Sequence, residues 1–126
     1  MEQFGWICLA GAAGTGARYL IATWAAQRLG AAFPYGTLIV NLSGCFAITL
    51  IMHAALTLAW PTALRSALTV GLLGGFTTYS SFDYETTKLM QEGAHLPAAV
   101  NVAVTVIGGL VAGWLGLVVA RELVGP

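Results

Sequence analysis

Long uncharged stretches are the feature that most restricts what this chain can fold into. Residues 29–64, 66–82 and 93–120 carry no formal charge, and only Arg18 interrupts residues 3–27. A helix needs about 20 mainly apolar residues to cross the hydrocarbon core of a bilayer. We therefore predict an all-α membrane protein, one domain of residues 1–126. Its four transmembrane helices are expected over residues 4–28, 35–59, 63–90 and 95–122.

Composition excludes several classes of protein. Only 8% of the residues are charged and 58% are hydrophobic, whereas soluble domains are about 25% charged. A soluble chain of this size could not bury so much apolar surface. The formal net charge is zero, which removes the electrostatic case for a nucleic-acid partner. No motif of paired carboxylates, metalloprotease histidines or phosphate-binding glycines is present, so we expect a conduit or binding protein and no enzyme.

The few basic residues are balanced between the two ends of the predicted helices. With four spans, Arg65 and Arg121 fall on one face of the membrane, and Arg28 and Lys88 on the other. Orientation normally follows an excess of Lys and Arg on the cytoplasmic side, and here no excess exists. Two interpretations fit this count: a weak orientation bias, or dual topology in which copies insert both ways and pair antiparallel.

Small residues suggest close contacts between helices. Four short helices enclose little interior, so we expect assembly into an oligomer. Glycines four residues apart, Gly71 with Gly75 and Gly109 with Gly113, allow helix backbones to approach closely.

Polar side chains inside the predicted spans are candidates for function. For Arg18 we prefer a position facing protein or a water-filled vestibule, where it would attract anions, over snorkelling to the headgroups. Asn41 fits either an interhelical hydrogen bond or a donor toward a polar pathway. Asn101 and Thr105 are four residues apart and therefore share a face of the fourth helix.

The stretch GGFTTYSSF, residues 74–82, lies inside the third predicted span. Each glycine lowers helix stability by roughly 1 kcal/mol relative to alanine. A break here would free backbone groups that are tolerated at membrane depth where they line a cavity or bind an ion. Phe76, Tyr79 and Phe82 recur every third residue, which predicts one helical face whose electropositive ring edges suit an anion. A glycine hinge packed with core aromatics remains the alternative.

This stretch resembles the GGxTTFSTF signature of the Fluc (CrcB) family of bacterial fluoride channels. The resemblance extends along the chain: Arg18 lies in the first helix, and Asn41 lies in GTLIVNLSG (residues 36–44), which is similar to the family's GTLxVNxxG element. It implies a passive, fluoride-selective channel with a broken third helix. The implied assembly is an antiparallel dual-topology homodimer with two pores.

The resemblance also implies roles for individual residues. A structural Na⁺ at the dimer centre would be held by backbone carbonyls of Gly74 and Thr77 from both subunits. Tyr79 and Phe82 would line the pores with their ring edges, and Asn41 would lie near the fluoride path. Fluoride is small and strongly hydrated, so its passage requires substitutes for water. The side chains expected to supply hydrogen-bond donors are Asn41, Thr78, Ser80, Ser81, Asn101 and Thr105.

The biology implied is export. Fluoride enters acidified cells as HF, dissociates, and would leave the cytoplasm through the channel down its gradient, which gives fluoride resistance. We therefore expect a multi-pass protein of the bacterial inner membrane, surrounded by lipid.

Several positions depart from the family pattern. Tyr79 stands where phenylalanine is usual, and Ser81 replaces threonine. In the fourth helix, Asn101, Thr105 and Gly109 occupy positions where the family often has a tyrosine and two serines. These changes predict slower conduction with the fold retained.

Two other classes of membrane protein compete with a channel. Small multidrug transporters also have four short helices and dual topology, but they need a carboxylate in the middle of the first helix. Here that helix contains Arg18 and no acid beyond Glu2. A non-conducting structural protein would use residues 74–82 for packing only.

Overall fold

The computed structural model describes all 126 residues, and it is entirely helical, as predicted. Three long helices are α1 (Glu2–Leu29), α2 (Tyr35–Thr57) and α6 (His95–Val124). Each begins and ends within two residues of the span predicted for it. The remaining span is divided into α3 (Thr62–Ser66), η1 (Ala67–Leu73), α4 (Gly74–Phe76) and α5 (Tyr79–Gln91).

Helix ends follow from local backbone preferences. Gly30 ends α1 with φ 85°, and Gly93 lies between α5 and α6 with φ 78°. Both angles belong to the left-handed region, which glycine adopts without steric cost. Pro34 and Pro61 immediately precede α2 and α3, where the missing proline N–H costs no helical hydrogen bond.

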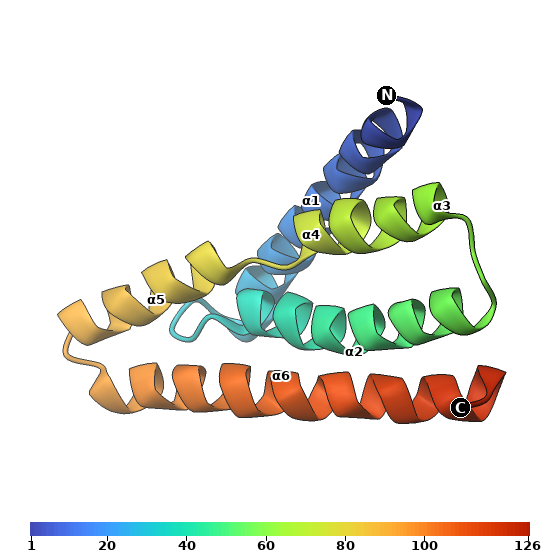
Figure 1. The fold of residues 1–126 in the computed structure, drawn as a ribbon. Helices are drawn as coiled ribbons and strands as arrows, with labels where there is room; N and C mark the ends of the chain where they lie inside the picture. The colour runs from blue at the N-terminus through green and yellow to red at the C-terminus, as the bar shows by residue number, and fades with distance from the viewer.

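The helices run alternately in opposite directions (Figure 1). Helices α2 and α6 pack along each other and run the same way, whereas the segment from α3 to α5 returns the other way. Helix α1 crosses them at a slant and packs on η1, α4 and α2. Both termini and residues 58–61 therefore lie toward one side, and residues 30–34 and 92–94 toward the other.

Glycines set the distance between α1 and the segment that follows α3. A Cβ added at Gly71 would lie 2.6 Å from the Ile7 carbonyl oxygen and 2.9 Å from the Ala10 Cβ. A Cβ at Gly75 would collide with the Gly11 carbonyl and lie 3.0 Å from the Thr15 Oγ1. The close approach predicted from the Gly71 and Gly75 pair is confirmed.

Helices α2 and α6 meet less tightly at the second predicted glycine pair. A Cβ at Gly109 or Gly113 would make contacts of 3.4 Å and 3.5 Å, to Cys45 Sγ and Thr49 Cγ2. Such contacts are close to ordinary van der Waals distances. The tightest point is Gly116, where an added Cβ would collide with the Phe46 carbonyl.

The element η1 is a π-helix of seven residues, which the sequence pattern did not predict. Such helices are rare and occur frequently at functional sites. In this chain η1 leads directly into α4 and contains Gly71, one of the glycines in contact with α1.

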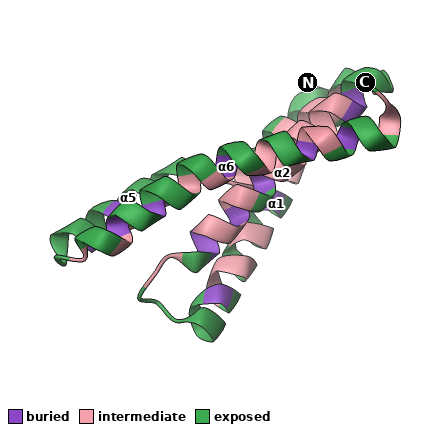
Figure 2. Ribbon diagram, turned by 90° about the horizontal axis from the view of Figure 1, so that it is seen from below, coloured by how far each residue is buried: buried purple, intermediate pink, exposed green.

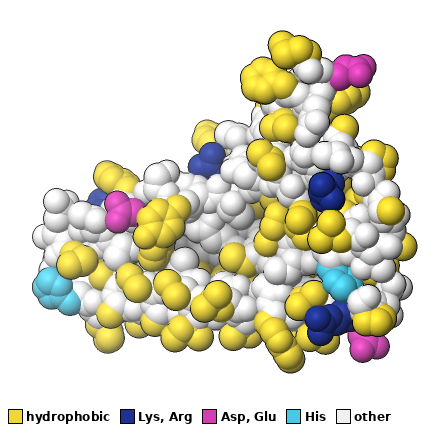
Figure 3. Space-filling view, in the orientation of Figure 1, with side chains coloured by type: hydrophobic (Ala, Val, Ile, Leu, Met, Phe, Trp, Pro, Cys, Tyr) yellow, Lys and Arg dark blue, Asp and Glu magenta, His cyan; other side chains and the backbone are white.

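The isolated chain has little interior. Only 18 of 126 residues are buried, and most of the ribbon is exposed or intermediate (Figure 2). Large apolar side chains stand exposed on every long helix. Figure 3 shows hydrophobic side chains spread over the visible face, with the charged ones few and scattered. Two helices, Tyr35–Thr57 and His95–Val124, are long and apolar enough to cross a membrane. A surface of this kind requires apolar surroundings.

We predict that Gly75→Ala destabilises the protein, because the new methyl group would force α1 and α4 apart. Overpacking of this kind costs about 1–3 kcal/mol. Thermal unfolding of the purified protein in detergent measures the loss. The matched control is Gly16→Ala, on α1, where an added Cβ meets nothing within 4 Å. Equal melting temperatures for the two variants would contradict the packing described here.

Candidate functional site

Two extended residues separate α4 from α5. Thr77 has φ −88° and ψ 155°, and Thr78 has φ −151° and ψ 116°. Backbone N–H and C=O groups on both sides of this interruption lose their helical partners. In an apolar medium each unpaired group is costly, so their hydrogen bonds define how the site is built.

Asn41 on α2 pairs with both backbone groups of Thr78. Its Nδ2–H donates to the Thr78 carbonyl at 2.9 Å, and its Oδ1 accepts from the Thr78 N–H at 2.8 Å. The side-chain amide thus makes the same pair of backbone hydrogen bonds that a residue of a neighbouring β-strand would make. One amide N–H of Asn41 remains beyond this pair, because a primary amide carries two. The interhelical hydrogen bond is therefore present, and the second N–H can still act as a donor toward a polar pathway. Both interpretations of Asn41 fit the structure.

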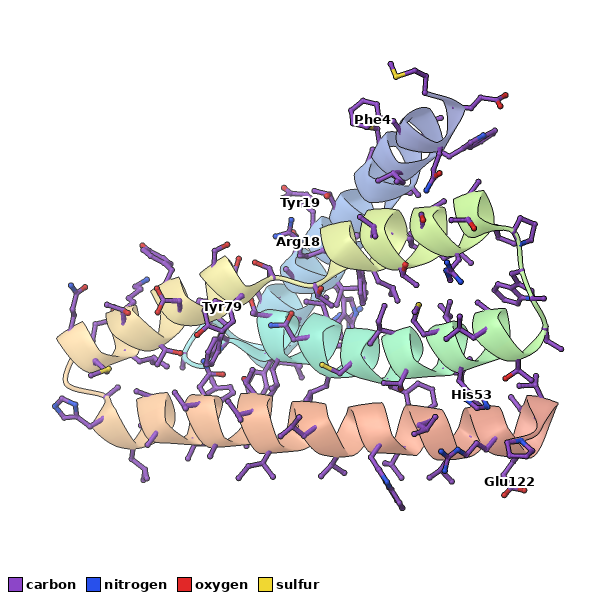
Figure 4. The ribbon with its side chains drawn as sticks, viewed as in Figure 1. Phe4, Arg18, Tyr19, His53, Tyr79 and Glu122 are labelled. Atoms are coloured by element: carbon purple, nitrogen blue, oxygen red, sulfur yellow. The ribbon has the colours of Figure 1, made fainter.

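Other groups pair with the end of α4. The Leu73 carbonyl accepts from the Thr77 N–H at 3.0 Å and from the Thr77 Oγ1 at 2.9 Å. The Gly75 carbonyl accepts from the Arg18 Nε–H at 3.0 Å. In Figure 4 the Arg18 side chain lies beside the end of α4. Arg18 is thus part-buried against protein, which is the placement preferred over snorkelling.

The start of α5 is capped by a small cluster of hydroxyl groups. Thr78 Oγ1 accepts from the Ser81 N–H at 3.2 Å, the usual bond of an N-cap residue. The same oxygen lies 3.1 Å from Ser81 Oγ and 3.3 Å from Ser80 Oγ. Three of the hydroxyls predicted along the pathway therefore meet at one helix terminus.

Most of the predicted site residues line one groove of about 530 Å³. Seven of the eleven are in its wall: Asn41, Gly74, Thr77, Thr78, Tyr79, Phe82 and Thr105. They come from α2, the interrupted segment and α6. Gly109 also lines the groove, beside Thr105. Residues far apart in the sequence are thus brought to a single surface.

The two aromatic rings of this groove contact each other edge to face. The centroids of Tyr79 and Phe82 are 5.6 Å apart, with an interplanar angle of 64°. Phe82 is buried, whereas Tyr79 is 80% exposed and extends from the start of α5 toward α6 (Figure 4). Phe76 is not in the groove wall. The shared face predicted for all three rings was wrong, because that spacing applies only to a continuous helix.

Four predicted residues lie outside the groove wall: Arg18, Ser80, Ser81 and Asn101. Asn101 is 2% exposed and donates from Nδ2 to Thr86 Oγ1 at 2.9 Å, and Thr86 Oγ1 donates to the Phe82 carbonyl at 2.7 Å. These two hydrogen bonds join α6 to α5 and end at the backbone carbonyl of Phe82. A contact of Asn101 with fluoride stays a prediction.

The sequence did not indicate that Glu85 lines a cavity with its carboxylate. Its Oε1 accepts from Thr37 Oγ1 at 2.8 Å, and its Oε2 is buried without a hydrogen-bond partner. It lines a second cavity of about 270 Å³ between α1, α2 and α5. Glu85 stands among Asp83, Lys88 and Glu92 in the chain, so nothing in the spacing distinguished it from exposed charges.

The carbonyl groups of Gly74 and Thr77 fit a bound cation. No side chain donates a hydrogen bond to either one, and both residues line the groove. A Cβ at Gly74 would meet the Thr69 carbonyl oxygen at 3.9 Å, an ordinary van der Waals distance, and no other atom within 4 Å. Unwound backbone carbonyls are the ligands that Na⁺ takes in interrupted membrane helices.

Apolar helices around a polar break indicate a membrane protein, and comparison with known proteins identifies its family. The model of the family described as CrcB-like protein, Camphor Resistance (CrcB), matches residues 5–117. A fluoride-specific ion channel FluC of Sorangium cellulosum is 51% identical, over 98% of both chains. One of Citrifermentans bemidjiense is 48% identical, over 98% of this chain and all of the relative.

This chain therefore belongs to the CrcB family, which confirms the resemblance found in the sequence. The curated relatives are ion channels. The prediction that the chain is not an enzyme is confirmed by that membership.

We predict that Asn41→Ala loosens the interruption, because both backbone groups of Thr78 lose their partners. Hydrogen exchange of peptides covering residues 76–82 is expected to accelerate about tenfold or more, since an unpaired buried group costs about 1–3 kcal/mol. Asn41→Asp keeps the acceptor for the Thr78 N–H and should protect that amide better.

Ser43→Ala is the control, because Ser43 donates only to carbonyls of its own helix. Exchange in Asn41→Ala no faster than in Ser43→Ala would contradict the role given to Asn41.

Proposed function

We propose that this protein is a passive, fluoride-selective ion channel that exports fluoride from the cytoplasm and gives fluoride resistance. The observation that carries this proposal is the groove, where donors and ring edges from three parts of the chain converge beside a helix interruption. The names of the relatives, fluoride-specific ion channels, support the choice of ion.

Fluoride binds its hydration water strongly, so a narrow path must offer replacement donors. The groove is lined by Asn41, which keeps a second amide N–H, and by Thr105 with its hydroxyl. The Thr78 hydroxyl donates to Ser81 Oγ at 3.1 Å and would have to turn away from it to bind fluoride. The edges of aromatic rings carry partial positive charge, and Tyr79 and Phe82 stand close together beside these donors. In our proposal a desolvated anion moves along this wall from donor to donor.

We infer that the channel is an antiparallel, dual-topology homodimer with two pores. The groove lies on the open surface of the chain, so one subunit does not enclose a path, and a second copy would cover it. Arg65 and Arg121 at one end balance Arg28 and Lys88 at the other, which gives neither orientation an advantage. The apolar surface left over would face lipid.

A structural Na⁺ at the centre of such a dimer is part of the proposal. Gly74 and Thr77 would hold it with backbone carbonyls from both subunits. A bound cation lowers the electrostatic cost of an anion in a low-dielectric slab. The interrupted segment would then form a broken third transmembrane helix in a multi-pass protein of the bacterial inner membrane.

Purified protein reconstituted in liposomes tests the channel function. With a fluoride gradient, we expect efflux far above that of protein-free vesicles, and no comparable efflux of chloride. An electrode that senses fluoride outside the vesicles measures the rate. Absence of efflux for both ions would overturn the proposal, and residues 74–82 would then serve only to pack the helices. Proton-coupled export of cationic drugs would favour a small multidrug transporter.

Tyr79→Phe is expected to change the fluoride rate by several-fold while leaving assembly unaltered. The hydroxyl adds a polar group to a ring that is 80% exposed in the groove, and its loss restores the residue usual in the family. Efflux from liposomes with matched protein content measures the change. Tyr84→Phe is the control, because Tyr84 is exposed on the same helix and outside this groove. An unchanged rate in Tyr79→Phe would remove this hydroxyl from the pathway.

A further inference from the structure

The end of α4 presents several carbonyl oxygens, and only some of them have partners. Helical backbone from Thr62 to Phe76 stops at the extended residues, so the carbonyls of its last turn point toward the interruption. Leu73 is bonded within the segment, and Gly75 is bonded to Arg18. No side chain donates to the carbonyl of Gly74.

We propose that Arg18 is a positioning residue that selects which carbonyls a cation can use. By holding the Gly75 oxygen, its Nε–H fixes the end of α4 so that the carbonyls of Gly74 and Thr77 remain free on the groove side. This inference rests on the proposed central Na⁺ and adds a residue of α1 to its support.

The reach of Arg18 follows from the packing of α1 on α4. Gly75 lies so close to α1 that an added Cβ would collide with the Gly11 carbonyl and approach Thr15. Arg18 is three residues beyond Thr15 and lies on the same face of α1. The guanidinium is thereby held at the end of α4, where 3.0 Å separates Nε from the Gly75 oxygen.

The charge of Arg18 also favours its position at the end of α4. The carboxyl end of a helix carries partial negative charge and favours a cation nearby. Arg18 has no carboxylate partner, since the one salt bridge in the structure joins Lys88 and Glu92. The oxygen atoms at the end of α4 are thus the counterpart of its charge. A free cation beside Gly74 would share the same helix end, at a different oxygen.

Two substitutions separate the hydrogen bond from the charge. In Arg18→Gln, an amide N–H stands at the same number of bonds from the backbone as Nε of arginine, and the charge is lost. In Arg18→Lys, the charge is kept, but a methylene group occupies the place of the donor. A role through charge alone predicts that lysine substitutes well and glutamine poorly. Positioning through Gly75 predicts the reverse.

The experiment titrates Na⁺ against the melting temperature of the purified protein, with N-methylglucamine as the replacing cation. A ligand that binds only the folded state raises this temperature, so the half-saturating Na⁺ concentration can be read without measuring transport. We expect it to rise about tenfold in Arg18→Lys, because a hydrogen bond to a charged donor is lost. In Arg18→Gln we expect it to stay within about twofold of the unsubstituted protein, because the donor remains.

The outcomes are distinct. An unchanged value in Arg18→Lys, or a tenfold rise in Arg18→Gln, overturns the positioning role. If Arg18→Lys does not fold, the Na⁺ titration of Arg18→Gln tests the positioning role by itself. If the melting temperature of the unsubstituted protein does not depend on Na⁺, this inference is also overturned, whether or not the protein releases fluoride from liposomes. Failure of fluoride efflux in liposomes, with the Na⁺ response intact, would instead count against the channel and leave the role of Arg18 standing.

Discussion

The interruption at Thr77 and Thr78 creates the constraint on which the rest of this structure depends. Peptide groups released from a helix must find partners, because an apolar surrounding offers none. Asn41 pairs with Thr78, and Arg18 pairs with Gly75. Arg18 on α1 and Asn41 on α2 are therefore explained first by the backbone of a different segment. The groove lies beside these hydrogen-bonded groups and remains open.

Close helix contacts make those supports possible. Glycines at positions 71 and 75 bring α1 against the segment before the break, and only at this separation does Arg18 reach the end of α4. Asn101 and Thr86 join α6 to α5 through hydrogen bonds that end at the Phe82 carbonyl. The helix that carries Tyr79 and Phe82 is thus held to α6.

Much of the fold could be predicted from the spacing of charges, since uncharged stretches of span length determine α1, α2 and α6 within two residues. The Gly71 and Gly75 pair predicted a close helix contact for the same kind of reason, because small residues at four-residue spacing let helix backbones approach. Among the predicted site residues, five of the motif at residues 74–82 line one groove together with Asn41 and Thr105. The helix bounds and the glycine contact rest on patterns that are local in the chain.

What the sequence could not supply depends on contacts across the fold. The π-helical stretch and the placement of Phe76 follow from how the interrupted segment packs, and periodicity assumes a regular helix. The hydrogen bond of Asn101 could not be predicted from its spacing to Thr105, because its partner Thr86 lies on another helix. Glu85 was missed because its partner Thr37 is 48 positions away in the chain.

The anchoring on both sides of the interruption has a mechanical consequence. An extended residue spans about 3.3 Å and a helical one about 1.5 Å, so winding Thr77 and Thr78 into a helix would draw α4 and α5 together by roughly 3–4 Å. Helix α1 packs tightly on α4 at Gly75, and α6 is hydrogen-bonded to α5 through Asn101. Closing the gap between the two half-helices would therefore require one of these contacts to shift or break.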